Sequence, residues 1–325
     1  MSDLALLSIT RDCVNRGNLI IEHAVRRTLG VERFAVELDA HQPLGDAELE
    51  AIHRCRALVL PGATLLQPED HAAVAGLDRV EVPILAPGVA LRSPEDRADL
   101  GVARHLRLPV GSRDPFTHRS LTEAGIPSAL VGCPTLLLGA AEGWVRRDGP
   151  VVVSPGLGPQ EPIRDCVRAC AAVAPTVLLL HAPDRQGAAE LGLDDGTVEA
   201  RGLDSAEQAF ALIAGASVVV TGRIHALLSA IIHGTPAIFL GPWYDSRYSL
   251  VEDLGVPIEP PVARRIARLV EAVHAGELPP STVFGRAARL RANLVRWLHE
   301  VAAPLGVAVP ALPGVLAVRP AEGAP

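Results

Sequence analysis

The 325-residue chain exceeds the usual size of a single hydrophobic core, so we expect two domains of about 150 residues each. Hydrophobic residues make up 49% of the chain and aromatic residues only 3%, so Val, Leu, Ile and Ala must fill the core, as in buried parallel strands with covering helices. The net charge of −7 and the scattered basic residues, all of them Arg, argue against a nucleic-acid-binding surface, whereas a small anionic ligand held by a few arginines stays open.

The cysteines and the N-terminal sequence predict a protein that has no disulfides and is not exported. Five cysteines, an odd number without paired C-x-x-C spacing, predict neither a disulfide framework nor a zinc ribbon. No basic n-region opens the chain and no apolar run reaches about 18 residues. We therefore expect no signal peptide, no membrane span and a cytoplasmic location.

Short apolar runs alternate with helical stretches in the first half of the chain, which is typical of a βα repeat. The predicted strands are Leu4–Ile9, Phe34–Leu38, Ala57–Leu60, Val82–Ala86, one at Val110, and Ala129–Val131. The predicted helices are Leu19–Leu29, Asp46–Cys55 and Asp114–Gly125. Asn18 is expected to cap the first of these helices and Asp114 the last, in front of Pro115.

A second βα series follows Gly139–Gly149, the predicted interdomain linker. Its predicted strands are Val151–Ser154, Val177–His181, Thr197–Ala200, Val218–Thr221 and Ala237–Leu240. Its predicted helices are Pro162–Ala174, Ser205–Ala214, Ala226–His233, Ser246–Leu254, Ala263–Ala275 and Arg286–Ala302. The pattern predicts an α/β fold of two Rossmann-like, doubly wound domains at 1–140 and 150–305, with a final helix that packs back on the first domain and a Pro/Ala-rich tail at 306–325.

Ligands of open α/β sheets bind beyond the carboxyl ends of the strands, and the segment Thr221-Gly222-Arg223-Ile224-His225 is the most informative of these loops. Gly222 lets the backbone turn, and the amides of the helix start favour a phosphate or carboxylate, which Arg223 would clamp. His225 lies in the first helical turn, where the helix dipole favours a neutral ring that accepts a proton. The structural alternative is that Arg223 pairs with the other domain and His225 only caps the helix.

Three other loops carry weaker signals. Asn15-Arg16-Gly17-Asn18 allows close approach of a ligand or simply starts a helix. The stretch Gly111–Arg119, with Arg113, Asp114 and His118, predicts either an anion site or a surface charge network. His181, near Asp184 and Arg185, is a second-site candidate or a structural residue. No glycine-rich phosphate loop, nucleophile elbow or cluster of metal ligands is present in the sequence, so no metal is predicted.

In their order along the chain these segments resemble the polysaccharide pyruvyl transferase family. Asn15–Ile20 is similar to the family's N-terminal Asn-x-Gly-Asp turn, and Gly111–Leu121 to its Arg-Asp/Glu-x-x-Ser/Thr helix start. Val131–Thr135 follows as expected. The segment Val218–Pro236 resembles the family's Ser-Arg-Leu-His stretch with its downstream Gly-x-Pro, and Tyr244–Arg247 stands in place of a Tyr-Asp-x-Lys stretch.

The resemblance implies a glycosyltransferase-B-like pair of domains, with phosphoenolpyruvate as an anionic co-substrate in the cleft and no other cofactor. The acceptor, a sugar, glycolipid or other diol, would sit on the N-terminal side and receive a pyruvate ketal, while the donor sits on the C-terminal side. His225 is then the candidate acid/base and Arg223 the candidate clamp. The expected substrate-binding residues are Asn15, Gly17, Asn18, Arg113, Asp114, His118, His181, Thr221, Gly222 and Arg247.

The chain departs from the family pattern at the loop Pro61-Gly62-Ala63, which is poorer in Gly than is common, and at two single positions, of which Asn18 concerns the acceptor. Asn18 stands in place of the usual Asp and removes a charge, whereas Arg247 in place of Lys keeps it. Two other functions stay open: a nucleotide-sugar glycosyltransferase of the same fold, with Glu259 as the acid that grips a ribose, and a catalytically silent member that acts as a binding partner. Homo-oligomerisation is also left open.

Overall fold

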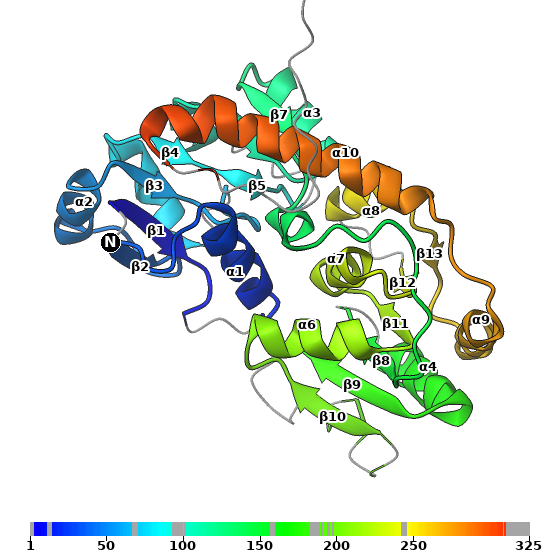
Figure 1. Cartoon of the computed structure of the whole chain (residues 1–325). Coiled ribbons are helices and arrows are strands. Elements are labelled where there is room, and N and C mark those ends of the chain that lie inside the picture. Colours follow the sequence, from blue (N-terminus) through cyan, green and yellow to red (C-terminus); the bar gives the residue numbers. More distant parts are fainter. Residues whose placement is uncertain are drawn as a thin grey trace, which may run out of the picture.

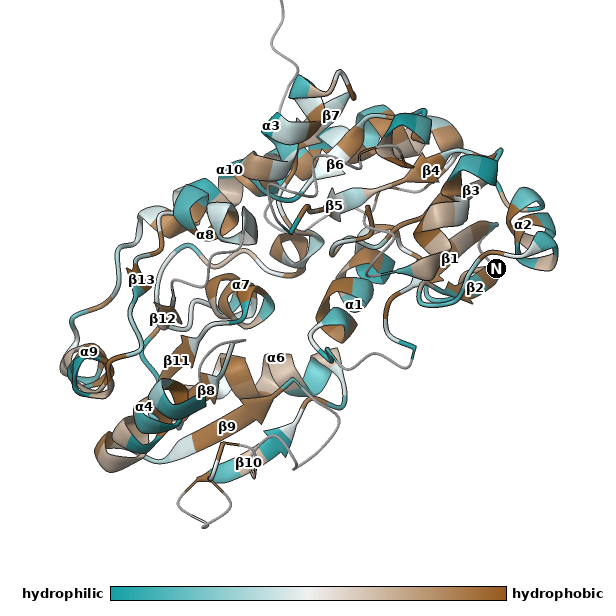
Figure 2. Ribbon diagram, turned by 180° about the vertical axis from the view of Figure 1, so that it is seen from behind, coloured by the Kyte–Doolittle hydropathy of each residue, from teal (hydrophilic) through white to brown (hydrophobic). Residues whose placement is uncertain are grey.

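The computed structural model describes residues 3–11, 15–66, 71–92, 100, 102–156, 160–181, 189, 191–193, 196, 198–241, 246–307 and 309. Parallel sheets with helices packed against them make it an α/β fold (Figure 1). The strands at the centre of the second half are almost free of polar side chains, and Figure 2 shows β9 and β11 in brown, while α4 and α9 outside them mix hydrophilic with hydrophobic residues. The core therefore lies between each sheet and its covering helices, as Val- and Leu-rich strands require.

The second-half sheet has the strand order β10-β9-β8-β11-β12-β13, all parallel, which is the 3-2-1-4-5-6 order of a Rossmann fold. Its strands are β8 (Val151–Ser154), β9 (Thr176–Leu180), β10 (Glu199–Gly202), β11 (Val218–Thr221), β12 (Ala237–Leu240) and β13 (Ile258–Glu259). The predicted bounds of β8, β11 and β12 are confirmed to the residue. The short strand β13 carries no apolar run and was not predicted.

In the first half, β2-β1-β3-β4 form one parallel ladder and β5-β6-β7 another. The strands are β1 (Leu4–Ser8), β2 (Val36–Asp39), β3 (Ala57–Val59), β4 (Ile84–Leu85), β5 (Pro87–Val89), β6 (Val110–Ser112) and β7 (Ser128–Leu130). Only Ala86 separates β4 from β5, and its carbonyl accepts a hydrogen bond from the Gly111 amide at 3.0 Å. The two ladders are therefore nearly continuous. Pro87, which has no N–H to donate, marks the break.

Helices cover both sheets at nearly the predicted places: α1 (Asn18–Thr28), α2 (Asp46–His53), α3 (Pro115–Glu123), α4 (Gln160–Val173), α6 (Ala206–Gly215), α7 (Ile224–His233), α8 (Ser249–Leu254), α9 (Ala263–Ala275) and α10 (Thr282–Trp297). The predicted cap of α3 is confirmed, because Asp114 Oδ1 accepts a hydrogen bond from the Thr117 amide at 2.8 Å. The predicted cap of α1 is wrong. Asn18 is the first residue of that helix, Gly17 precedes it as N-cap, and Asn18 Nδ2 donates to the Ile9 carbonyl at 3.2 Å.

The last long helix, α10, crosses from the second half of the chain to the first (Figure 1). Phe284 and Leu290 belong to the same core cluster as residues of α7, whereas Leu294 and Trp297 pack with Leu4 and other residues of the first sheet. The Trp297 indole Nε1 donates to the Pro109 carbonyl at 2.9 Å. Most of the predicted tail, at 308 and 310–325, lies outside the described residues.

Four of the cysteines, Cys55, Cys133, Cys166 and Cys170, are buried and unpaired by disulfides. Burial raises the pKa of the Cys170 thiol to about 12, with the neighbouring Cys166 adding to the effect. These thiols pack as small hydrophobic groups, in keeping with their sequence context. Cys13 lies outside the described residues. In the part of the chain that the structure describes, none of the helices combines the length and apolarity that crossing a membrane requires.

Candidate active site

The carboxyl ends of the strands in the two halves of the chain meet each other. The Arg16 amide, in the loop after β1, donates to the His181 carbonyl at the end of β9 at 2.9 Å. At a second point, Ser249 Oγ at the start of α8 donates to Asp114 Oδ1 at the end of β6, at 3.1 Å. Because ligands of open α/β sheets bind beyond the carboxyl ends of strands, this junction is where a site shared by both halves would lie.

The loop from β11 to α7 is folded around Ser154, the last residue of β8. Thr221 Oγ1 donates to the Ser154 carbonyl at 2.8 Å, and the Gly222 amide donates to the same carbonyl at 3.2 Å. The Arg223 amide donates back to Thr221 Oγ1 at 2.8 Å, and Arg223 Nε donates to the Pro155 carbonyl at 2.8 Å. The Arg223 guanidinium is therefore held at the carboxyl edge of β8 and β11.

Close backbone packing explains the glycine at position 156, which faces the β11–α7 loop. A Cβ at Gly156, in the loop after β8, would lie 2.8 Å from the Gly222 carbonyl oxygen and 3.0 Å from its Cα. The two loops thus touch through their main chains. A side chain at position 156 would force the two loops apart, so the β11–α7 turn keeps its place because the facing loop has glycine there.

His225 is the second residue of α7, and Arg223 is its N-cap, in an extended conformation without a side-chain cap. The helix dipole places partial positive charge at this end, beside the Arg223 side chain. Nε2 of His225 is buried, and its backbone carbonyl accepts a hydrogen bond from Ser229 Oγ at 2.7 Å. An arginine, a histidine and the start of a helix are therefore gathered on one turn.

His181 is buried where the two halves touch. Its Nε2 lies 2.9 Å from Ser154 Oγ, and its Nδ1 faces Gly17 so closely that a Cβ there would lie 2.8 Å from the nitrogen. Nδ1 has no hydrogen-bond partner among the described residues. Burial, aided by the nearby Arg223 charge, lowers the pKa of His181 to about 3. The ring is therefore neutral at physiological pH.

Arg113 and Asp114 form a buried pair at the second point of contact. Arg113 is 2% exposed, and its Nε lies 3.8 Å from Asp114 Oδ2. Burial raises the pKa of Asp114, while Arg113, Thr117 and Ser249 act in the opposite direction. Asp114, which accepts hydrogen bonds from Thr117 and Ser249, ties α3 to α8 and so links the two halves of the chain.

The remaining predicted residues are dispersed. Asn15 Oδ1 accepts from the Gly17 amide at 3.2 Å and shapes the turn before α1. His118 turns to the sheet, with Nδ1 3.1 Å from Ser128 Oγ at the start of β7. Glu259 contacts Arg265 Nε at 2.5 Å, so its carboxylate is already paired. Tyr244, Asp245, Asp184, Arg185 and the side chain of Arg247 lie outside the described part of the chain.

Gly17, His181, Thr221, Gly222 and Arg223 are thus brought to one place, and His225 follows directly. Ser154 supports both His181 and the β11–α7 turn and was not among the predicted site residues. The sequence feature that could have identified Ser154 is its position as the last residue of a predicted strand.

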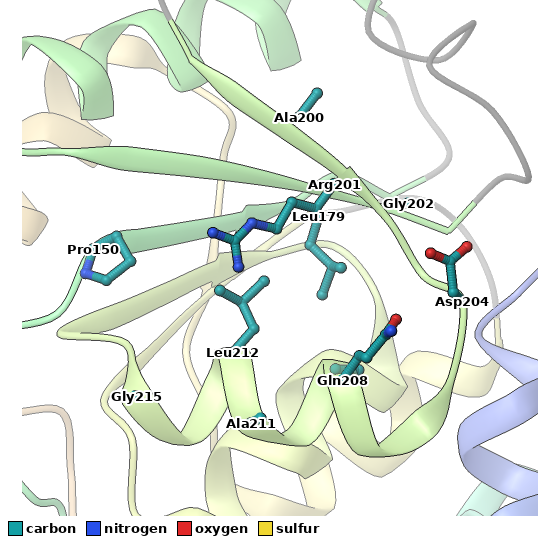
Figure 3. A pocket seen from close by; sticks show the side chains of 11 residues that line it. Pro150, Leu179, Ala200, Arg201, Gly202, Asp204, Gln208, Ala211, Leu212 and Gly215 are labelled. Atoms are coloured by element: carbon teal, nitrogen blue, oxygen red, sulfur yellow. The ribbon is translucent and has the colours of Figure 1, made fainter.

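A separate open pocket of about 760 Å³ lies at the outer edge of the second sheet, between β10 and α6 (Figure 3). Its lining includes Leu179, Arg201, Asp204, Gln208 and Leu212. Arg201 Nε contacts Glu199 at 2.6 Å on the same strand. The residues that line this pocket include none of the predicted site residues.

Comparison with solved structures shows the fold. The chain is similar to UDP-GlcNAc 2-epimerase from Methanocaldococcus jannaschii in complex with UDP-GlcNAc and UDP (12% identity, TM-score 0.55, covering 88% of this chain and 98% of that one). It is also similar to a putative UDP-N-acetylglucosamine 2-epimerase from Listeria monocytogenes (11% identity, TM-score 0.59, 92% and 96% covered) and to UDP-GlcNAc 2-epimerase from Neisseria meningitidis (11% identity, TM-score 0.58, 94% and 100% covered). The fold is glycosyltransferase-B-like.

No relative of the chain was found among curated proteins. The family model for polysaccharide pyruvyl transferase, however, matches residues 15–244, from the turn before α1 to four residues past the end of β12. The match covers more than two thirds of the sequence, including the contact of Gly17 with His181 and the whole β11–α7 turn. The chain therefore belongs to the polysaccharide pyruvyl transferase family.

Proposed function

We propose that the protein transfers the pyruvyl unit of phosphoenolpyruvate to two hydroxyls of a sugar or sugar-like diol, forming a pyruvate ketal and releasing phosphate. The observation that carries the proposal is the family match over both halves of the chain, with Arg223 and His225 at the start of α7 inside it. Phosphoenolpyruvate carries a carboxylate and a phosphate. Arginine side chains and helix N-termini are the groups that bind such anions.

The proposed reaction forms two C–O bonds and breaks one. The first acceptor hydroxyl attacks C2 of phosphoenolpyruvate and loses its proton to a base, while C3 gains a proton and becomes a methyl group. The second hydroxyl then attacks C2, and the bond from C2 to the phosphate oxygen breaks. Phosphate leaves with that electron pair and with the proton of the second hydroxyl, so no oxidant, reductant or metal is needed for balance.

His225 is our candidate for the acid/base at C3, and Arg223 for the clamp on the donor anion. The neutral His181, next to Arg223, adds no competing positive charge and supports the turn through Ser154. Arg113 and Arg247 are second-rank anion ligands in this proposal. Positioned general acids contribute roughly 10²- to 10⁴-fold to the rates of such reactions.

The proposal is tested by incubating the protein with phosphoenolpyruvate and a panel of sugar diols, while following phosphate release and the mass of the acceptor. His225→Gln is expected to lower turnover by about 10²-fold or more while phosphoenolpyruvate still raises the melting temperature. Arg223→Ala is expected to weaken that thermal shift. Arg296→Ala, an exposed arginine on α10, is the matched control and should behave as wild type.

The proposal fails if phosphoenolpyruvate neither raises the melting temperature nor supports transfer to any acceptor of the panel. A nucleotide-sugar transferase is the second candidate, because solved structures of similar fold are described as complexes with UDP or UDP-GlcNAc. A thermal-shift comparison of UDP, UDP-GlcNAc and phosphoenolpyruvate separates the two. Glu259, the acid that a ribose contact would need, is paired with Arg265, which weighs against this second candidate.

A further inference from the structure

A histidine–carboxylate pair lies outside the site described above, at the carboxyl end of β2. Asp39 is the last residue of that strand. Its Oδ1 accepts a hydrogen bond from the His41 amide at 2.9 Å and lies 3.0 Å from His41 Nδ1. The Asp39 side chain is 12% exposed and that of His41 is 32% exposed. A largely buried carboxylate therefore holds an imidazole that reaches the surface.

The carboxylate determines which ring nitrogen carries the proton. An ionised carboxylate can only accept hydrogen bonds, so the contact at 3.0 Å requires Nδ1 of His41 to carry hydrogen. In a neutral ring, Nε2 is then left with a lone pair and can accept a proton. His71 limits the freedom of the ring from another side, with ring centroids 5.1 Å apart. The imidazole is thus held in the tautomer and orientation that a general base needs.

The pair lies on the same edge of the first sheet as the contact with the second half of the chain. Asp39 is the register partner of Ser8, the last residue of β1, and the Ala40 amide donates to the Ser8 carbonyl at 2.8 Å. From this end of β1 the chain runs on to Arg16, whose amide is bonded to His181. Neighbouring parallel strands are about 4.8 Å apart, so Asp39 and the strand that leads to the junction are adjacent.

We infer that His41 is the general base that takes the proton from the attacking acceptor hydroxyl, and that Asp39 is its positioning residue. The inference rests on the proposed function. In the step, the acceptor oxygen forms its bond to C2 of phosphoenolpyruvate, and its proton passes to His41 Nε2. The π electrons of C2=C3 take a proton at C3 from His225, the candidate acid/base of the second half of the chain, so that one proton is taken up and one is given in the step. The acceptor is therefore a hydroxyl compound bound along the carboxyl ends of β1 and β2.

The test compares His41→Ala, Asp39→Asn and a control, His299→Ala, in the ketal-forming assay with phosphoenolpyruvate and the best acceptor of the panel. His299 is exposed on the segment Leu298–Ala302 that follows α10. His41→Ala is expected to lower kcat by about 10²- to 10⁴-fold, with an unchanged thermal shift by phosphoenolpyruvate. Added imidazole should restore part of that rate. Asp39→Asn should fall between His41→Ala and wild type.

Other results separate this inference from the proposed function. If the wild type binds no phosphoenolpyruvate and forms no ketal, the proposed function itself is wrong. If the wild type forms ketal and His41→Ala keeps its kcat, or raises only the acceptor KM, the role of His41 as base is overturned. Circular dichroism and the melting temperature of His41→Gln show whether a loss of rate comes from unfolding, and a folded, inactive His41→Gln supports the inference.

Discussion

Lowering the pH from 7 to 5 should destabilise the folded protein through His181. The folded state holds the pKa of His181 at about 3, whereas the unfolded chain has the ordinary value of 6.5. Below pH 6.5 the unfolded state therefore takes up a proton that the folded state does not, so this contribution to stability is complete above pH 6.5 and is lost as the pH falls toward 3. At pH 5, which is 1.5 units below 6.5, the loss is about 2 kcal/mol, at roughly 1.4 kcal/mol per unit.

The assay is urea unfolding at pH 7, 6 and 5, followed by tryptophan fluorescence, for wild type and His181→Gln. Glutamine does not titrate, so the free energy of unfolding of the variant should fall by about 2 kcal/mol less than that of wild type between pH 7 and 5. Burial also lowers the pKa values of His23 and His233, but both histidines are present in both proteins and their effect cancels. Equal pH dependence in the two proteins would refute the reasoning.

Four further substitutions, one of them a control, test the packing. Gly17→Ala places a methyl group 2.8 Å from a buried imidazole nitrogen and should lower the free energy of unfolding by about 1–3 kcal/mol. The control Gly285→Ala, at a helical position with open space, should leave that free energy unchanged or raise it by up to about 1 kcal/mol. The midpoints of urea unfolding measure both changes. Ser249→Ala removes the hydrogen bond to Asp114 and should lower the free energy of unfolding by about 1–3 kcal/mol, because a buried carboxylate loses a donor. An unchanged midpoint of urea unfolding would contradict that hydrogen bond. Leu294→Ala should cost about 2–5 kcal/mol in the same measurement, and a loss under 1 kcal/mol would show that α10 packs loosely.

Local patterns predicted the regular elements well where their physical causes are local. The strands Val151–Ser154 and Val218–Thr221 are runs of Val bounded by proline, polar or glycine residues, a pattern typical of short buried strands. The cap of α3 also depends only on neighbours, since Asp114 and Thr117 are three residues apart. The strand Pro87–Val89 was missed because Pro-Gly is typical of turns, and here a neighbouring strand recruits it into a ladder.

The candidate site was predictable only where its residues are close together in the sequence. Arg223 and His225 stand on one strand–loop–helix turn, so their proximity follows from the sequence. The contact of Arg16 with His181 depends on how two separately folded sheets are placed, and no periodicity encodes that placement. Asp39 and His41 are two residues apart, and only the register with β1 shows that the pair lies beside Ser8, at the carboxyl end of β1.

The crossing of α10 has a consequence for the order in which the protein can fold during synthesis. Leu4, Leu6 and Val25 share a buried cluster with Leu294 and Trp297, which the ribosome adds only after every strand of the second sheet. Domains generally fold as units as they emerge, N-terminal first. In this protein an apolar face of the nascent first half stays exposed until α10 has been synthesised. The chain would need chaperones most during this interval.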